Sequence, residues 1–404
     1  MKFILTTILI AMLSRISLSY RLFKLRNPSS TVSLNSAKSL STAIDTIQLG
    51  SSDLKVTKVC LGTMTWGQQN TEEEGVEQLE YAYQQGINFI DTAEIYPVPT
   101  KAETQGRTDR TIAKWLGTKD RSKIILASKV AGRGDHINWL PGRNGQFSKV
   151  SREQIKISVD ESLKRLNTDY IDVIQIHWPD RYVPLFGSPN YDIQKEREDA
   201  VPFEEQLVAF DELIRKGKVR YLGVSNETPY GIMKMNQVSK ELGLSTKIIS
   251  LQNSYSLLVR SDIETNLVEV CSKRHENIGI LAYSPLAGGI LTNKYANPET
   301  APKNARFSLF PGYMERYTKL KTKEVVQEYA KIAKKYDFTP TELALIWSYT
   351  RPYIASTIIG ATSIKQLKEN IDAYKKIDRF VQNPEIYNEI QEVHRYHREP
   401  TKEV

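Results

Sequence analysis

Short apolar runs alternate with amphipathic stretches from Thr46 almost to the C-terminus of this 404-residue chain. The apolar runs have the length of strands buried on both faces, and the stretches between them show the 3.6-residue period of helices. Eight runs are predicted to be strands: Val59–Gly62, Asn88–Asp91, Ile124–Lys129, Ile171–His177, Val219–Val224, Ile248–Gln252, Gly279–Tyr283 and Ser356–Ile359.

The stretches between the strands carry their own start and stop signals for helices. The predicted helices include Thr71–Gln85, Ser151–Leu166, Pro202–Lys216 and Asp262–Arg274. Two starts have the spacing of a capping box, namely Thr71 with Glu74 and Ser151 with Gln154. Glycines follow two of these helices, as expected for C-terminal caps: Gly86 and Gly217.

This alternation predicts an α/β fold, a single (β/α)8 TIM barrel over residues 45–404, with long loops at its C-terminal rim. Two short runs, Ile47–Leu49 and Leu54–Val56, flank Gly50–Asp53 and predict a β-hairpin before the barrel. An open doubly wound sheet is the alternative, but it usually has a Gly-x-Gly-x-x-Gly phosphate turn after its first strand. Gly62–Gly67 does not have this spacing, so we favour the barrel.

Three connections are longer than the scaffold requires, and each follows a strand: Pro97–Arg110, Pro179–Val201 and Pro285–Leu320. Loops that follow barrel strands lie on the rim where binding sites form. We therefore expect these loops to shape a binding site.

The formal net charge of +8 is concentrated near the N-terminus. No acidic residue precedes Asp45, whereas six basic residues do: Lys2, Arg15, Arg21, Lys24, Arg26 and Lys38. Removing these six charges leaves about +2 for the rest of the chain, too little by itself for a phosphate-binding surface. Nucleic acid is therefore not an expected partner.

Residues 1–44 are predicted to form a targeting leader that is removed or lacks structure. Phe3–Leu13 is an apolar run of signal-peptide length, too short to span a membrane. Ser14–Ala43 is rich in Ser, Arg and Lys and lacks acidic residues, as transit peptides do. This order resembles the bipartite leaders of proteins sent to plastids of secondary origin, with secretion and mitochondrial import as alternatives. No membrane association is expected once the leader is removed.

The metal-binding and disulfide-forming residue types are sparse. Cys60 and Cys271 are too few for a disulfide framework or a zinc site, and Cys60 lies in an apolar run typical of a core thiol. His394 and His397 have no obvious third ligand, so a surface helix explains them better than a metal site. We expect no metal.

Four residues with chemically useful side chains lie at or just beyond predicted strand ends: Asp91, Tyr96, Lys129 and His177. The C-terminal strand ends of a barrel converge on one mouth, so these side chains should meet. A phenol with a pKa of about 10 is a reluctant acid, and the charge of Lys129 would lower that pKa. Asp91 would keep Lys129 charged, and His177 would donate to a substrate carbonyl oxygen.

Each of the four also has a plainer structural interpretation. A tyrosine after a strand is usually a packed rim residue, an Asp–Lys pair is usually a salt bridge, and a single histidine usually satisfies a hydrogen bond. The placement of all four at three strand ends favours a catalytic group.

The motifs around these residues resemble the aldo-keto reductase superfamily from about Thr46 to Ala373. The segments that carry the resemblance are Leu61–Met64, Asn88–Tyr96, Ala127–Lys129, Gln175–Pro179, Gly223–Asn226, Gln252–Leu258, Ala282–Gly289 and Ile359–Thr362. Tyr96–Pro99 and Glu103–Gly106 are similar to the branch represented by the bacterial Tas protein.

The resemblance implies NADP(H) bound in an extended form across the mouth. Ser225, Asn226 and Gln252 would hold the nicotinamide carboxamide, and Tyr283 would stack on its ring. The residues implied at the pyrophosphate are Ser284, Pro285, Leu286, Gly288, Lys294 and Arg306. Those implied at the adenosine end are Gly360, Thr362, Gln366, Glu369 and Asn370, and the implied set also includes Thr63, Met64 and Asp91. Lys365 departs from the commonest pattern, and we interpret it as a solvated helix charge rather than a 2′-phosphate ligand.

The predicted function is NADPH-dependent reduction of a small-molecule carbonyl substrate, aldehydes before ketones, with Tyr96 as the general acid. A regulatory subunit resembling the β subunits of potassium channels is the alternative, because that relative keeps the same barrel and the same four residues. A lyase or isomerase with Lys129 as a Schiff-base amine is a third possibility, but Asp91 would keep that amine charged.

Overall fold

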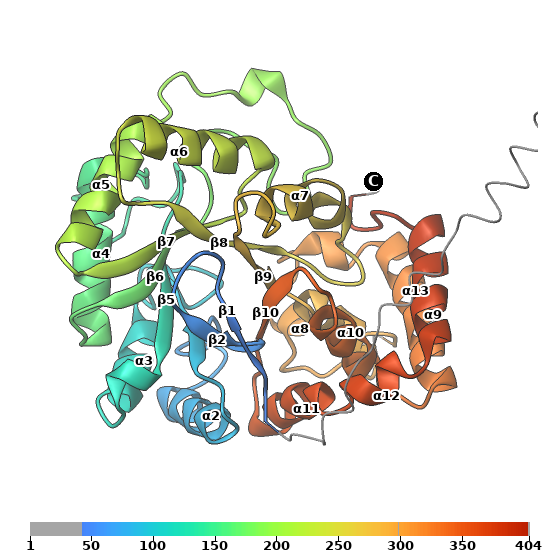
Figure 1. The fold of residues 1–404 in the computed structure, drawn as a ribbon. Coiled ribbons are helices and arrows are strands. Elements are labelled where there is room, and N and C mark those ends of the chain that lie inside the picture. Colours follow the sequence, from blue (N-terminus) through green and yellow to red (C-terminus); the bar gives the residue numbers. More distant parts are fainter. Residues whose placement is uncertain (1–42, 298, 403–404) are drawn as a thin grey trace, which may run out of the picture. The chain divides into compact units, whose positions relative to one another are not determined.

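The computed structural model describes residues 43–297 and 299–402. It confirms the closed barrel, whose parallel strands follow the order β10-β3-β4-β5-β6-β7-β8-β9 (Figure 1). The barrel strands are β3 (Val59–Gly62), β4 (Phe89–Asp91), β5 (Ile125–Val130), β6 (Ile171–Ile176), β7 (Val219–Ser225), β8 (Ile248–Ser254), β9 (Gly279–Tyr283) and β10 (Ile354–Ile359). The predicted hairpin is also present, as β1 (Thr46–Gln48) and β2 (Lys55–Thr57).

The predicted strand bounds differ from the observed ones by at most two residues. Asn88 precedes β4, and its carbonyl already accepts from the Ile125 N–H at 2.8 Å. Its side chain binds the hairpin: Oδ1 accepts from the Thr57 backbone N–H at 2.9 Å, and Nδ2 donates to the Lys55 carbonyl. His177 follows β6 directly, so its side chain still starts at the end of the strand.

Helices surround the barrel, and α9, α12 and α13 form an additional group near the C-terminus (Figure 1). The α-helices are α2 (Glu72–Gln84), α3 (Arg107–Leu116), α4 (Arg152–Leu166), α5 (Phe203–Arg215), α6 (Pro229–Glu241), α7 (Val268–Cys271), α8 (Arg306–Leu309), α9 (Leu320–Lys335), α10 (Pro340–Tyr349), α11 (Ile364–Tyr374), α12 (Ile377–Val381) and α13 (Pro384–Tyr396). Short 3-10 or π turns are η1 (Arg121–Lys123), η2 (Ile193–Lys195), η3 (Asp262–Leu267), η4 (Ala287–Thr292) and η5 (Glu315–Tyr317).

One of the two predicted capping boxes is confirmed and one is wrong. Thr71 and Glu74 cap each other's backbone at the start of α2. Ser151 caps α4, but the Gln154 side chain turns away and accepts from the Lys149 backbone N–H at 2.8 Å. Both predicted glycine caps are confirmed, because Gly86 and Gly217 follow α2 and α5 with φ of 86° and 71°.

Three predicted ranges differ most from the structure. The helix expected over Asp262–Arg274 is the π turn η3 followed by the single turn of α7, and it ends at Cys271. The loop expected over Pro97–Arg110 ends at Gly106, because α3 begins at Arg107. Pro285–Leu320 contains three short helical segments, η4, α8 and η5, rather than plain loop.

The hairpin closes the barrel at the N-terminal ends of its strands. Leu49, Leu54 and Val56 are buried against Phe89, Val173 and other strand residues, and Cys60 belongs to the same cluster. Gly50 makes this fit possible: it has a φ of +55°, and a Cβ there would lie 2.2 Å from the Ile249 carbonyl oxygen.

A buried aspartate binds two arginines at this end of the barrel. Asp172, on β6, accepts from Arg121 at 2.8 Å, from Arg220 at 3.1 Å and from the Leu126 backbone N–H at 3.0 Å. Arg220 reaches on to Asp53 in the hairpin turn. The carboxylate therefore ties β5, β6, β7 and the hairpin together.

The predicted leader lies outside the described residues except for its last two positions. One of these, Ile44, packs in the main core cluster. No helix within residues 43–297 and 299–402 is long and apolar enough to cross a membrane.

We predict that Asp172→Ala lowers stability far more than Asp53→Ala. Loss of Asp172, which is 2 % exposed, leaves the largely buried Arg121 without its counter-ion and the buried Leu126 N–H without its acceptor, at about 1–3 kcal/mol for each unsatisfied group. Asp53 forms an exposed pair, for which about 1 kcal/mol or less is expected. Thermal and urea unfolding of both variants measure the difference, and equal shifts in the two midpoints would contradict it.

Candidate active site

The four predicted residues meet at the C-terminal mouth of the barrel. The Lys129 ammonium lies 2.6 Å from Asp91 Oδ2, 2.9 Å from the Thr92 carbonyl oxygen and 3.4 Å from the Tyr96 hydroxyl. The Tyr96 and His177 rings meet edge to face, with centroids 5.8 Å apart. Residues separated by up to 86 positions thus form one contiguous group, as predicted.

Asp91 is held from both sides. Its second oxygen, Oδ1, accepts from Gln252 Nε2 at 2.8 Å and from Gln175 Nε2 at 3.2 Å. Gln175 is fully buried on β6 and was not among the predicted site residues. Its polar side chain within an otherwise apolar strand was the signal that could have identified it, because a buried amide needs partners.

The electrostatic environment of Tyr96 differs from the prediction. We expected Lys129 to lower the pKa of the phenol, but burial and then the negative charge of Asp91 raise this pKa well above its ordinary value. Asp91 lies so close to Lys129 that its charge offsets that of the ammonium. Tyr96 therefore stays protonated at neutral pH, which is the form that a proton donor requires.

His177 is neutral at physiological pH. Burial, and then the nearby charge of Lys129, lower the pKa of its imidazole well below 6.5. Nδ1 is buried without a hydrogen-bond partner among the described residues, and the ring lies between those of Tyr96 and Trp178. A neutral imidazole has a single N–H, which suits it to orient an acceptor.

A cavity of about 970 Å³ opens above this group. All of the predicted cofactor-binding residues line it, namely Thr63, Met64, Asp91, Ser225, Asn226, Gln252, Tyr283, Ser284, Pro285, Leu286, Gly288, Lys294, Arg306, Gly360, Thr362, Gln366, Glu369 and Asn370. Tyr96 and His177 line it as well, whereas Lys129 lies beneath its wall with a fully buried side chain. Lys365 is exposed and is not part of the lining.

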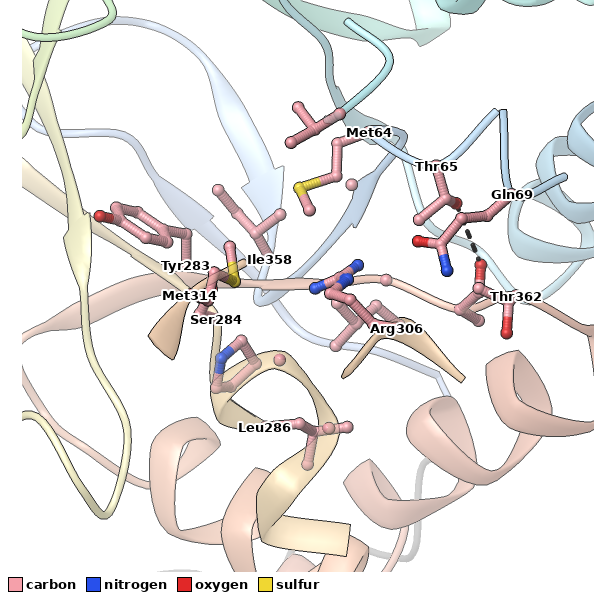
Figure 2. Close-up of a pocket in the computed structure, with 18 of the residues that line it drawn as sticks. Met64, Thr65, Gln69, Tyr283, Ser284, Leu286, Arg306, Met314, Ile358 and Thr362 are labelled. Carbon is pink, nitrogen blue, oxygen red and sulfur yellow. Dashed lines mark hydrogen bonds between the residues drawn. The ribbon is translucent and has the colours of Figure 1, made fainter. Parts of the chain in front are cut away.

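Two cations on the long loop after β9 lack a carboxylate partner within the described ranges. Among the described residues no ion pair involves Lys294 or Arg306, and burial lowers the pKa of each. Arg306 extends into the cavity between Met314 and Thr362 (Figure 2). Gly289, with a φ of +100°, lets Lys294 lie close, because a Cβ there would be 3.0 Å from the ammonium.

Several predicted cofactor residues bind each other in this structure. Asn226 accepts from the Tyr283 hydroxyl at 2.7 Å and donates to the His177 carbonyl at 2.8 Å. At the other end of the cavity, Gln366 accepts from the Thr362 backbone N–H at 3.0 Å. These side chains therefore shape the cavity wall, and their predicted contacts with a cofactor remain predictions.

The connection after β5 also lines the cavity, and the sequence prediction missed it. Arg133, His136 and Ile137 come from residues 131–150, and Trp178 follows His177. Arg133 donates to Asp135 and Asp199, so it also joins this connection to the loop after β6. The length of the stretch between the predicted strand and the helix at Ser151 was the available signal.

Within residues 43–297 and 299–402, no group of three or more His, Cys, Asp or Glu side chains could hold a metal ion. Cys60 and Cys271 are both buried free thiols, as expected for Cys60.

The closed barrel and the Asp–Tyr–Lys–His group at its mouth are features of a TIM-barrel oxidoreductase. The model of the Aldo/keto reductase family matches residues 58–393, and the chain belongs to this family.

Curated relatives agree with this assignment. The chain is 40 % identical to the Tas protein of Escherichia coli over 355 residues, which are 86 % of this chain and 97 % of Tas. It is 44 % identical to an aldo-keto reductase of Babesia bovis over 257 residues, 62 % of this chain and 89 % of that protein. A Schizosaccharomyces pombe protein, provisionally named as a voltage-gated potassium channel β subunit, is 32 % identical over 350 residues, 85 % of this chain and 92 % of that protein.

The lowered pKa of His177 predicts a stability difference that depends on pH. Below about pH 6.5 the unfolded chain binds a proton at this histidine that the native state does not bind, so native stability falls with acid. His177→Gln lacks this contribution. The unfolding free energy of the parent minus that of His177→Gln should therefore decrease as the pH is lowered from 7.5 to 5. Urea titrations at several pH values measure it, and a constant difference would contradict the prediction.

Proposed function

We propose that this protein reduces carbonyl compounds with NADPH, aldehydes in preference to ketones, and that Tyr96 is the general acid. The observation that carries the proposal is the 3.4 Å contact between the Tyr96 hydroxyl and the ammonium of the buried Lys129–Asp91 pair, at the base of a cavity large enough for a dinucleotide. Aldehydes are favoured because they are more electrophilic than ketones, and because the family commonly reduces them.

Each of the four residues has a separate role in proton transfer. The His177 N–H orients the carbonyl oxygen toward Tyr96, which gives its proton to that oxygen as the carbonyl carbon gains a hydride. The product is an alcohol, and solvent restores the proton to the phenolate. Lys129, whose ammonium lies 3.4 Å from this oxygen, donates to the phenolate in the meantime, and Asp91 keeps Lys129 charged and in place.

The residues around the cavity fit a nicotinamide dinucleotide, which supplies the hydride when bound. Lys294 and Arg306 form no ion pair within the described residues, so both can offer positive charge to a pyrophosphate. The half-buried Tyr283 ring faces the cavity beside Asn226, where an aromatic face would pack on a flat heterocycle. The preference for NADPH over NADH rests on the family resemblance, because both cofactors carry the same pyrophosphate.

The two alternative functions are a Schiff-base enzyme, which the site disfavours, and a regulatory subunit, which a relative supports. Lys129 is unsuited to form a Schiff base, because its side chain is fully buried, bonded to Asp91 and absent from the cavity lining. A regulatory role is supported by the similarity to the S. pombe protein named as a channel subunit. Binding of NADPH without turnover of any aldehyde would favour that role.

We predict that Tyr96→Phe loses turnover by about 10²- to 10⁴-fold, the usual contribution of a general acid. The affinity for NADPH should change little, because the hydroxyl acts on the substrate. NADPH absorbance followed with a panel of aldehydes and their matched methyl ketones measures turnover, and quenching of protein fluorescence measures binding. Equal turnover in the parent and the variant would exclude Tyr96 as the acid.

We predict that Arg306→Met weakens NADPH binding by about tenfold or more, the typical value of a charge-assisted hydrogen bond. Lys365→Met is the matched control, because Lys365 is an exposed cation outside the cavity, and it should change affinity by no more than about twofold. Fluorescence titration with NADPH and with NADH measures both variants. Equal affinity of the parent for the two cofactors would contradict the NADPH preference.

A further inference from the structure

Glu94 ends the pairing between β4 and β5 in an unusual way. Beyond Asp91 the backbone continues to pair with β5, since the Thr92 N–H donates to the Ala127 carbonyl and the Glu94 N–H to the Lys129 carbonyl. The next donor on that side, the Ala131 N–H, is instead taken by the Glu94 side chain, at 2.6 Å from Oε1. The carboxylate thus replaces a strand partner and frees the chain to turn.

That turn carries Tyr96 to the mouth of the barrel. The Glu94 carbonyl accepts from Gln105 Nε2 at 2.6 Å, and the Tyr96 carbonyl accepts from the Gly106 N–H at 2.9 Å. The short segment from Thr92 to Tyr96 has no regular secondary structure. These bonds therefore contribute to the position of the Tyr96 hydroxyl relative to Lys129.

Arg143 neutralises the buried charge of Glu94. Its guanidinium donates to Glu94 Oε1 at 2.8 Å and to Ser148 Oγ at 2.9 Å, and it also binds Ser158 on α4. The side chains of Arg143 and Glu94 are 0 % and 3 % exposed, so the pair is as buried as Lys129–Asp91. Neither residue lines the cavity.

The connection that Arg143 anchors packs on Tyr96 itself. Ile137 and Leu140, from the same connection, share one apolar cluster with Tyr96, Ile95 and Ala131. Ile137 also lines the cavity. The ion pair therefore holds together the segment bearing Tyr96 and the wall that faces it.

We propose that the Glu94–Arg143 pair positions Tyr96, and with it the adjacent cavity wall, for proton transfer to the substrate. This inference rests on the proposed function, because it assigns the pair to the acid of that reaction. Neither residue contacts substrate, so both act through Tyr96.

Arg143→Met tests the proposal, because it leaves the Glu94 carboxylate without its counter-charge. We expect kcat to fall by about 10- to 100-fold, as displacement of a catalytic group by about 1 Å can do, while the Kd for NADPH changes less than about twofold. The isotope effect with a cofactor deuterated at the transferred position should increase, because the chemical step becomes more rate-limiting.

Glu94→Gln combined with Arg143→Met is the rescue variant. The glutamine oxygen can still accept from the Ala131 N–H, and no unpaired charge remains, so kcat should return to within about fivefold of the parent. If Arg143→Met does not fold, Arg143→Lys replaces it, since lysine keeps the charge but not the multiple contacts, and a loss of about fivefold is expected.

Arg260→Met is the control for losing a buried ion pair elsewhere. Arg260 is 3 % exposed, pairs with Glu264 and does not line the cavity. The Arg260→Met variant should have a lower thermal midpoint, but its kcat per folded site and its isotope effect should be unchanged, because this pair has only a structural role.

The outcomes separate the two proposals. Unchanged kcat and isotope effect in the Arg143 variants, beside lost turnover in Tyr96→Phe, would overturn the positioning role and leave the proposed function intact. Equal turnover in the parent and Tyr96→Phe would remove the proposed function and this inference with it.

Discussion

A lysine ammonium that is sealed from water has to be neutralised where it lies, and the mouth of this barrel is built around that requirement. Lys129 is fully buried, and Asp91, on the neighbouring strand, is its counter-ion at 2.6 Å. Removing one partner of such a pair costs about 3–5 kcal/mol, so the two side chains are fixed together. Gln175 and Gln252 occupy the other carboxylate oxygen, which leaves Asp91 one orientation. The cavity and Tyr96 are arranged around this rigid centre.

The sequence predicted the barrel and the meeting of the four residues because both depend on periodicity. Asp91, Lys129 and His177 lie at strand ends, and parallel strands bring their ends to one mouth. The direction of the Tyr96 pKa was not predictable in this way. It depends on how deeply the phenol is buried and on its distances to Asp91 and Lys129, and a pattern of residue types contains neither quantity.

The connection from residue 131 to residue 150 shows why loops were predicted least well. Arg143 and Glu94 form a buried pair although 49 residues separate them, and neither lies in a periodic segment. Gln154 likewise fitted a capping box by spacing but bonds to Lys149, because the end of this connection offers its backbone N–H. Such contacts follow from the path of one irregular segment, which local propensity does not determine.

The hairpin fills the N-terminal end of the barrel, opposite the reactive end. Leu49, Leu54 and Val56 seal that end, and the described chain enters there, beside Asp45 and Thr46. The chemistry occupies the opposite rim, at the C-terminal ends of the strands. The packing that seals the barrel and the side chains that react therefore belong to opposite ends of the same strands, so substitutions can alter one while the other keeps its geometry.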